Sequence, residues 1–417
     1  MATYLKKAIR KIEEKESKTR EIVRGLLNRI RSQGESAVRE LAAKFDNWTR
    51  DFILSQEEIQ ALIDRVPQTA KDDIRFAYDQ VYGFAVKQRE SMKAFETELS
   101  PGVTLGQRLI PCLCAGCYVP GGRFAHAASA IMSVATAKAA GVPSVVACTP
   151  PRGDSIDSTV AFALSLSGAD VIMALGGVQA IGTMAFGLFT GKPADIIVGP
   201  GNAYVAEAKR ELFGEIGIDV LAGPTESLII ADQTADPMIV AVDLVSQCEH
   251  GYDSPVWLLT DSKILGEKVI EIMPKVIADL LNPGVAASSW HDYGEVVLGK
   301  DREELAEIND AYAAEHVQVI AEDLDWYLEN LHNYGSLFLG EGCTVSYGDK
   351  TSGTNHILPT KRAARYSGGL NVGKFIKILT YQKLTKEANR TIGAVASRIS
   401  RYEGMEGHAR AAEIRLR

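Results

Sequence analysis

One short stretch, Val242–Ser254 (VDLVSQCEHGYDS), concentrates groups that bind metals or attack substrates. It combines a glutamine, a cysteine, a glutamate and a histidine in four consecutive residues. On a helix, Gln247 and His250 share a face because they lie three residues apart, whereas Cys248 points elsewhere. A metal site, a thiol catalyst and the polar end of a buried helix are all open interpretations. The thiol catalyst is the weakest, because no neighbouring base would activate Cys248.

Three other segments place a carboxylate close to a histidine. They are Tyr347–His356 (YGDKTSGTNH), Ala313–Ile320 (AAEHVQVI) and Tyr402–His408 (YEGMEGH). Four of the seven histidines lie in these segments or in the opening stretch. Nitrogen and oxygen ligands of this kind suit a tetrahedral Zn²⁺ ion, so the clusters together favour a metal site. His291 and His332 fit scattered surface histidines better.

The elements that must position these residues alternate between strands and helices from about Cys117 onward. Asp236-Pro237 is a good helix start, and Gly251 is a plausible stop for the helix that carries Gln247. Near-continuous apolar strands between helices predict parallel sheets covered on both faces. The predicted strands are Ser144–Cys148, Asp170–Ala174, Asp195–Val198, Ser227–Ala231, Val256–Thr260, Val317–Ile320 and Ser336–Leu339. The first hundred residues are predicted to be helical, and the basic region after about Thr360 is predicted to be strand-poor, with helices that pack on a second subunit.

Glycine turns follow the predicted strands. They read YVPGGR (Tyr118–Arg123), ALGGVQ (Ala174–Gln179), GPGNAY (Gly199–Tyr204) and AGPTES (Ala222–Ser227). Ligands of open α/β sheets bind beyond the carboxyl ends of strands, and glycine lets the backbone approach them closely. No G-x-G-x-x-G motif precedes a helix, so nucleotide binding and simple tight turns both remain possible.

Composition excludes several classes of protein. A chain of 417 residues can hold two or more domains. Its net charge of -8 argues against a nucleic-acid partner, and no apolar run approaches the length of a membrane span. The charged N-terminus is unlike a secretory signal, and six cysteines are too few for a disulfide framework, so we expect a cytoplasmic protein.

The chain resembles the histidinol dehydrogenase family over most of its length. The shared motifs are GCYVPGG, GGVQAI, GPGNAYV, AGPTE, DLVSQCEHG, EHVQVI, SGTNHILPT and the pair Glu403/His408. The resemblance implies that Gln247, His250 and Asp349 are zinc ligands and that Cys248 is not. It further implies that His408 is the fourth ligand and comes from the partner subunit of a homodimer with shared active sites.

The resemblance also implies a reaction, the oxidation of a primary alcohol to a carboxylate through a bound aldehyde, with two hydride transfers to NAD. His316 would be the base for the hydroxyl proton, and Glu315 would activate the water that adds to the aldehyde. Zn²⁺ would hold the substrate, one ion per site.

The residues implied to contact NAD are Tyr118, Gln179 and Asn202. Those implied to lie at the substrate are the four metal ligands, His316, Thr225, His356 and Glu403. Tyr118 could instead pack beside a turn, Asn202 could hold the glycine turn, and His356 could be structural.

The fold implied is α/β, with two Rossmann-like parallel-sheet domains and a C-terminal helical tail exchanged in a dimer. An N-terminal helical segment is expected at 1–20. The domain with the metal and catalytic residues is expected at 21–117 plus 228–366, and the NAD-binding domain at 118–227. Residues 367–417 would form the tail. The NAD domain of the family is an incomplete Rossmann fold, which accounts for the missing glycine fingerprint.

The substrate pocket departs from biosynthetic histidinol dehydrogenases. After the PGG turn the chain reads GGRFAHAAS, which places Arg123 and His126 beside the expected site. Arginine suits an anionic group and would repel the histidinol cation. The pattern is similar to the sulfopropanediol 3-dehydrogenase branch, which oxidises (R)-2,3-dihydroxypropane-1-sulfonate to 3-sulfolactate in organosulfonate catabolism. Arg123 could also serve the NAD pyrophosphate. Oxidation of L-histidinol to L-histidine is the alternative. A non-catalytic metal-binding relative is a remote one, because Glu315 and His316 are both present.

Overall fold

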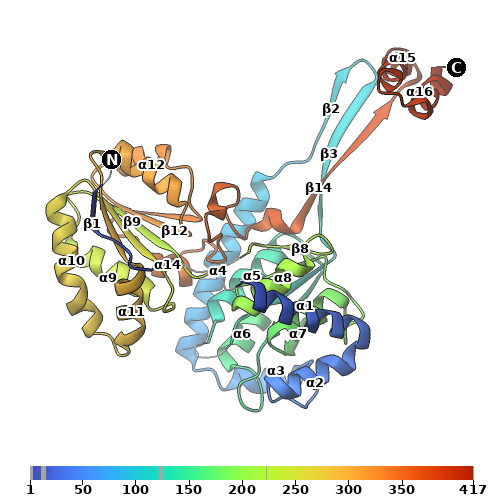
Figure 1. Cartoon of the computed structure of the whole chain (residues 1–417). Helices are drawn as coiled ribbons and strands as arrows, with labels where there is room; N and C mark the ends of the chain where they lie inside the picture. The colour runs from blue at the N-terminus through green and yellow to red at the C-terminus, as the bar shows by residue number, and fades with distance from the viewer. Residues whose placement is uncertain (1–2, 11–15, 122–124, 222, 417) are drawn as a thin grey trace.

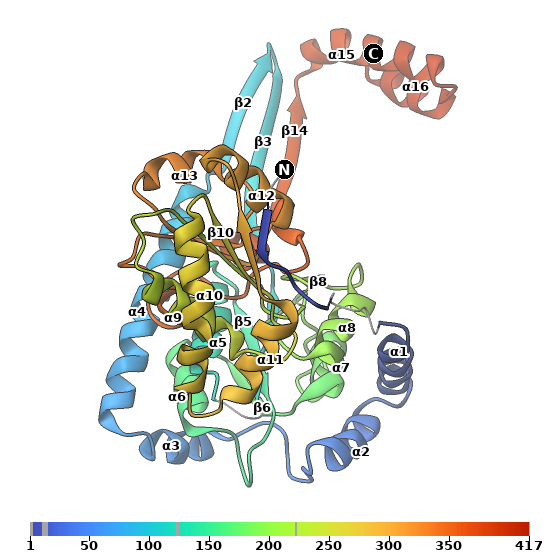
Figure 2. The ribbon, with the colours of Figure 1, turned by 60° about the vertical axis from the view of Figure 1, so that its left-hand side comes forward.

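The computed structural model describes residues 3–10, 16–121, 125–221 and 223–416. Two α/β domains lie side by side, and a long arm projects away from them (Figures 1 and 2). This architecture confirms the predicted α/β class with two parallel-sheet domains, and exchange of the C-terminal tail in a dimer stays a prediction. Among the described residues, no helix is both long enough and apolar enough to cross a lipid bilayer.

The five-stranded domain carries a parallel sheet with helices on both faces. Its strands are β4 (Cys114–Tyr118), β5 (Ser144–Thr149), β6 (Val171–Ala174), β7 (Ile196–Val198) and β8 (Gly217–Ile218), in the order β6-β5-β4-β7-β8. Its connecting helices are α5 (Ala127–Ala139), α6 (Ser158–Leu166), α7 (Gly177–Phe186) and α8 (Ala203–Leu212). The chain moves outward from β4 to β6 and then returns to β7 on the other side of β4. Right-handed crossovers therefore place α5 and α6 on one face and α7 and α8 on the other.

The N-terminal helices complete this same domain. They are α1 (Glu16–Gln33), α2 (Glu35–Phe45), α3 (Gln56–Asp64) and α4 (Gln68–Ser91). Helices α1 and α2 contact α7, whereas α3 and α4 contact α6. Apolar side chains such as Val23, Ile30 and Leu41 join the core of the five-stranded sheet. This packing differs from the expected division, which placed 21–117 with the metal-binding domain, because a helical pattern does not say which sheet the helix covers.

The six-stranded domain has the order β1-β11-β10-β9-β12-β13. Its strands are β1 (Thr3–Lys6), β9 (Ser227–Ala231), β10 (Val256–Thr260), β11 (Glu295–Leu298), β12 (His316–Ile320) and β13 (Ser336–Leu339). Its helices are α9 (Pro237–Cys248), α10 (Lys263–Ala278), α11 (Pro283–Tyr293), α12 (Arg302–Tyr312), α13 (Leu324–Asn330) and α14 (Val345–Lys350). One apolar core joins α9–α11 to the sheet, and a second joins α12 and α13 to its other face. All neighbouring strands are parallel except β1, which pairs antiparallel with β11.

The arm is a three-stranded antiparallel sheet that ends in a helical hairpin. It contains β2 (Phe95–Ser100), β3 (Val103–Pro111) and β14 (Ile376–Leu384), followed by α15 (Lys386–Tyr402) and α16 (Glu406–Glu413). Both views show α15 and α16 at its far end (Figures 1 and 2). Several of its large apolar side chains are exposed, for example Leu99, Ile378, Ile399 and Tyr402.

The seven predicted strands all form, with ends shifted by no more than one residue. Three expectations were wrong. Thr3–Lys6 and Phe95–Ser100, within the first hundred residues expected to be helical, are the strands β1 and β2, and Ile376–Leu384, in the region expected to be strand-poor, is β14. All three lie at a sheet edge or in the arm, where most side chains are not buried, so an apolar strand pattern is weak.

Candidate active site

Three of the four candidate metal ligands, Gln247, His250 and Asp349, lie where α9 and α14 end. The side chain of Asp243 in α9 accepts hydrogen bonds from Gln318 of β12 (2.7 Å) and from Thr344 (2.9 Å), and so ties α9 to β12 and to the start of α14. One turn later in α9, Gln247 is buried, and its Oε1 has no hydrogen-bond partner among the described residues. His250 follows the helix end, with its Nε2 3.9 Å from Oδ2 of Asp349. An amide oxygen without a donor, an imidazole and a carboxylate are thus available to a cation.

Cys248 is not part of this group. Its side chain belongs to the apolar core of the six-stranded domain and is fully buried. Burial raises the pKa of its thiol to about 12, although Ser289 opposes this change through a hydrogen bond. With such a pKa the thiol stays protonated near neutral pH, which disfavours the thiol-catalyst interpretation.

Glu315 and His316 lie at the amino end of β12, and Glu226, just before β9, holds both. The backbone N–H of Glu226 donates to Oε2 of Glu315 (3.2 Å), and its carbonyl accepts from the backbone N–H of His316 (3.1 Å). The same carbonyl lies 3.4 Å from Nδ1 of His316. A carbonyl only accepts, so we assign the ring proton to Nδ1. Nε2 is then left as a bare, buried acceptor without a hydrogen-bond partner among the described residues.

The electrostatics of this pair are set by burial and by mutual charge. Burial raises the pKa of Glu315 to about 8, against the opposing effect of His316. Burial alone would lower the pKa of His316, but the charges of Glu315 and Asp349 raise it. The Nε2 atom lies 3.6 Å from Oδ1 of Asp349, which is too long for a hydrogen bond but close enough for a strong charge interaction. Burial would raise the pKa of Asp349, yet His316, His356 and His250 hold it at about 2.

His356 joins the two domains. Its Nδ1 lies 3.0 Å from the carbonyl oxygen of Asp349, and its Nε2 lies 2.9 Å from Oγ of Ser129 in α5. Burial lowers its pKa to about 4, so the ring is neutral. Both ring nitrogens therefore have protein partners, which supports the structural alternative; a contact with the substrate stays a prediction. Thr225 is half-buried beside Glu226.

Two cationic or protonatable groups border the metal-ligand cluster. His126 precedes α5, and its pKa is lowered by burial and by the positive charge of Lys350. Lys350 follows Asp349 directly in α14, and its charge also lowers the pKa of His250 and His356, where burial is the larger cause. Arg123 lies outside the described residues.

The glycine turns of the five-stranded domain gather at its topological switch point. The order in which strands are added to the sheet reverses between the parallel strands β4 and β7, whose carboxyl ends are Tyr118 and Val198. Gly199 has a φ of +119°, and a Cβ there would come within 1.9 Å of the carbonyl oxygen of Tyr118. Asn202 caps α8 by accepting from the N–H groups of Tyr204 and Val205. Glycine at position 199 therefore lets the end of β7 approach the backbone of β4 closely.

The other two predicted coenzyme residues are buried. Burial raises the pKa of Tyr118 to about 12, and its hydroxyl accepts from the N–H of Gly177 (3.2 Å). Gln179, in the first turn of α7, donates from Nε2 to Asp46 (2.9 Å). In this structure the ring of Tyr118 packs beside the turn, as the alternative interpretation proposed. Its contact with NAD remains a prediction.

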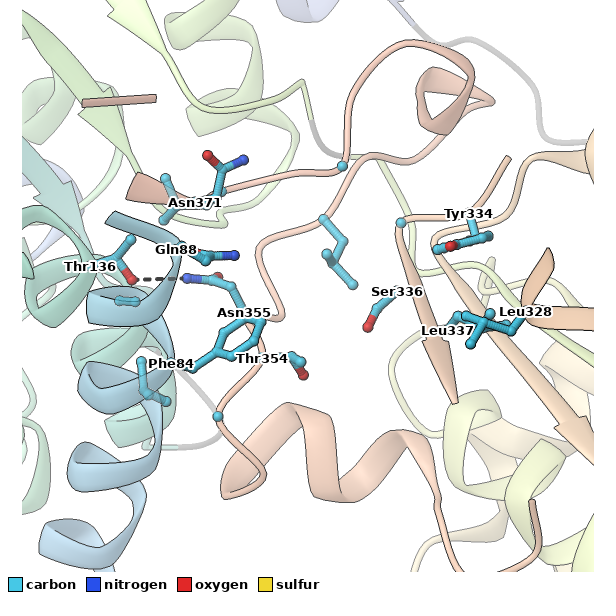
Figure 3. Close-up of a pocket in the computed structure, with 17 residues that line it drawn as sticks. Phe84, Gln88, Thr136, Leu328, Tyr334, Ser336, Leu337, Thr354, Asn355 and Asn371 are labelled. Carbon is cyan, nitrogen blue, oxygen red and sulfur yellow. Dashed lines mark hydrogen bonds between the residues drawn. The ribbon is translucent and has the colours of Figure 1, made fainter. Parts of the chain in front are cut away.

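A cavity of about 350 Å³ lies on another side of the segment that joins the domains (Figure 3). It is bordered by α4, the start of β13 and residues 353–371, and Asn355 donates to Oγ1 of Thr136 at its wall (3.3 Å). None of the predicted site residues lines it. This cavity is therefore separate from the predicted site residues.

Glu403 and His408 are not brought to these clusters by their own chain. Both are exposed at the tip of the arm. Within the described part of the chain, no group of three or more His, Cys, Asp or Glu side chains is arranged to hold a metal ion. The predicted ligand set, which includes Gln247 and His408 of a second subunit, therefore stays a prediction.

Sequence reasoning missed three residues that the structure brings into these sites: Glu226, Lys350 and Asp46. Glu226 is the last residue of the AGPTE motif, and Lys350 adjoins the predicted ligand Asp349, so each had a usable signal. Asp46 carried no such signal in the sequence, because its partner Gln179 is 133 positions away.

Comparison with known proteins agrees with the motifs. Residues 9–416 match the family model described as histidinol dehydrogenase. The chain is 55% identical over 416 residues to the sulfopropanediol 3-dehydrogenase of Ruegeria pomeroyi, covering 99% of this chain and 96% of that protein. It is also 55% identical over 421 residues to a histidinol dehydrogenase homolog of Pelagibacter ubique, covering 100% and 98% of the two chains. The crystal structure of histidinol dehydrogenase from Elizabethkingia anophelis superposes with a TM-score of 0.91 at 32% identity, covering 99% and 94% of the two chains. The chain therefore belongs to the histidinol dehydrogenase family of oxidoreductases.

Proposed function

We propose that this protein oxidises a primary alcohol to a carboxylate with two molecules of NAD, through a bound aldehyde. The observation that carries the proposal is the buried pair Glu315–His316. The Nδ1 of His316 is occupied by the Glu226 carbonyl, and its Nε2 is bare and close to the candidate metal ligands. A base and a second titratable group beside a cation site are what alcohol oxidation followed by water addition requires.

The residues present fit a zinc ion. Gln247 offers an orphaned buried oxygen, His250 a ring nitrogen and Asp349 a carboxylate with a pKa of about 2. This donor set suits Zn²⁺, and His408 of a second subunit would complete it. When bound, the ion would hold and polarise the alcohol and aldehyde oxygens.

The protein's own residues would then move the protons. His316 would accept the hydroxyl proton at Nε2 while the alcohol carbon gives a hydride to NAD. Glu315, with its pKa raised to about 8 by burial, would take a proton from the water that adds to the aldehyde carbon. A second hydride transfer would leave the carboxylate. The glycine turns at the β4/β7 switch point would hold NAD, near Asn202 and Gln179.

For the substrate, we propose (R)-2,3-dihydroxypropane-1-sulfonate, which would give 3-sulfolactate. The relative with the sulfopropanediol name is 55% identical, compared with 32% for the histidinol dehydrogenase of known structure. Lys350 and His126 add positive or protonatable character beside the metal ligands, which favours an anionic substrate over a cation. L-Histidinol remains the second candidate, because the whole fold matches a histidinol dehydrogenase with a TM-score of 0.91.

We further propose a homodimer with shared sites. Helix α15 exposes Ile392, Val395 and Ile399 at helical spacing, and Tyr402 is 83% exposed. An apolar stripe on a projecting arm needs a partner surface. Packing against a second subunit would cover it and would carry Glu403 and His408 to that subunit's site.

The test is NADH formation from the sulfonated diol and from L-histidinol in parallel, each with and without a chelator. We expect turnover of the sulfonated diol that is lost on chelation and restored by Zn²⁺. Turnover of histidinol alone would support the proposed reaction type but contradict the proposed substrate. No turnover of either by zinc-loaded dimer would favour the non-catalytic alternative.

A further inference from the structure

We infer that Asp46, at the end of α2, is a positioning residue for the coenzyme: it fixes the amide of Gln179 and the first turn of α7. This inference rests on the proposed NAD site and goes beyond it, because Asp46 belongs to the N-terminal helices and to none of the motifs quoted above. Asp46 touches neither the substrate cluster nor the metal ligands.

One oxygen of Asp46 makes both contacts. Its Oδ2 accepts from Nε2 of Gln179 (2.9 Å) and from the backbone N–H of Gly176 (3.1 Å). The amide of Gln179 is thereby oriented, because only its nitrogen can donate to a carboxylate. Its Oε1 accepts no hydrogen bond within the described residues and is turned toward Gly177, 3.1 Å from where a Cβ of that glycine would lie. Gln179 therefore presents a bare acceptor at the turn.

The carboxylate also acts as the cap of α7. The N-cap residue of this helix is Gly176, which has no side chain to accept from the first free N–H groups. Asp46 supplies an anionic acceptor at this positive helix end, and the hydroxyl of Tyr118 accepts from the next N–H, that of Gly177. Two consecutive N–H groups of the turn are thus occupied by protein groups.

Glycine at position 176 is required by the same contact. A Cβ on Gly176 would lie 2.8 Å from Cγ of Pro150 and 3.0 Å from Oδ1 of Asp46. Pro150 follows β5 and Asp46 follows α2, so residues from two separate elements contact the turn. The conformation of the turn is therefore preset by protein contacts before a coenzyme arrives, which lowers the entropy cost of binding.

The test compares Asp46→Ala and Asp46→Asn with wild type. We expect Asp46→Ala to weaken NAD binding about tenfold, which corresponds to roughly 1.4 kcal/mol. Asp46→Asn should weaken it less, about threefold, because a neutral amide oxygen still accepts but more weakly. The dissociation constant of NAD is measured by calorimetry without any alcohol present. At saturating NAD, kcat should be unchanged while KM for NAD rises.

Asp170→Asn is the matched control. Asp170 also accepts from a backbone N–H, that of Val145 (2.7 Å), but it lies at the amino end of β6, whereas Gly176 follows the carboxyl end of that strand. It should leave NAD binding unchanged, which separates a local effect from general loosening of the domain. In a Gln179→Ala background, Asp46→Ala should weaken binding by much less than tenfold, since part of its effect passes through Gln179.

Each outcome is decisive. If wild type binds NAD and Asp46→Ala binds it within a factor of two, the positioning role is wrong while the proposed function stands. If Asp46→Ala and Asp170→Asn weaken binding equally, the effect is structural and the inference also fails. If wild type shows no NAD binding, the proposed function fails first.

Discussion

The buried ion pair behind the Gly199 turn allows a quantitative prediction for Lys209→Met. Nζ of Lys209 donates to Oδ1 of Asp219 (2.5 Å) and to the carbonyl oxygen of Gly199 (2.9 Å). Oδ2 of Asp219 accepts from the N–H of the same glycine (2.7 Å). The side chains of Lys209 and Asp219 are only 1% and 0% exposed. The pair therefore binds both the N–H and the carbonyl group of Gly199 through hydrogen bonds that are shielded from solvent.

Methionine has a similar length and shape but neither charge nor donors. Lys209→Met would leave the Asp219 carboxylate buried without a counter-charge and the Gly199 carbonyl without a donor. Breaking one partner of a buried pair costs roughly 3–5 kcal/mol. For a domain of this size, that corresponds to a fall in Tm of roughly 6–20 °C. The double variant Lys209→Met/Asp219→Asn should lose less, because no isolated charge remains buried.

The assay is thermal unfolding of the purified protein, followed by circular dichroism and calorimetry. Lys138→Met is the control, since Nζ of Lys138 makes an ion pair of similar length with Asp170 (2.7 Å), at a partly exposed position. That change should cost no more than about 1 kcal/mol. A loss of stability in Lys209→Met no larger than in this control would refute the reasoning. So would a double variant that is less stable than Lys209→Met.

Four further predictions concern the site and the assembly. His316→Ala should abolish turnover and leave the circular dichroism spectrum unchanged; a near-normal rate would remove His316 as the base. His250→Ala should weaken Zn²⁺ retention at least tenfold by elemental analysis after dialysis, against one ion per site in wild type, and full retention would exclude it as a ligand. Lys350→Met should raise KM for the sulfonated diol about two- to fivefold, with a smaller effect at high salt, because an exposed cation contributes little and is screened; an equal rise for an uncharged alcohol would contradict a charge role. Ile399→Asp should dissociate the expected dimer in sedimentation analysis and abolish activity with it, and a wild-type protein that is active as a monomer would disprove the shared site.

The sequence alone determined the local elements and the chemistry of the motifs. Apolar runs such as Val256–Thr260 predicted strands because burial on both faces of a parallel sheet leaves a continuous pattern. Asp236-Pro237 predicted the start of α9, and the structure has Asp236 as the cap and proline in the first turn. Glycine turns and polar clusters were visible because their residue types are constrained by turn geometry and ligand chemistry. These signals are local, so no knowledge of the fold was needed to read them.

Only the tertiary structure decided which distant groups meet. Helices α1–α4 pack on the helices that cover the five-stranded sheet, although their amphipathic pattern would suit either domain. The carbonyl of Glu226 orients His316 across 90 positions, and Asp46 reaches Gln179 across 133. Both ring nitrogens of His356 turned out to be occupied by the protein. Such contacts depend on how sheets and helices pack in three dimensions, and periodicity along one chain carries no information about that choice.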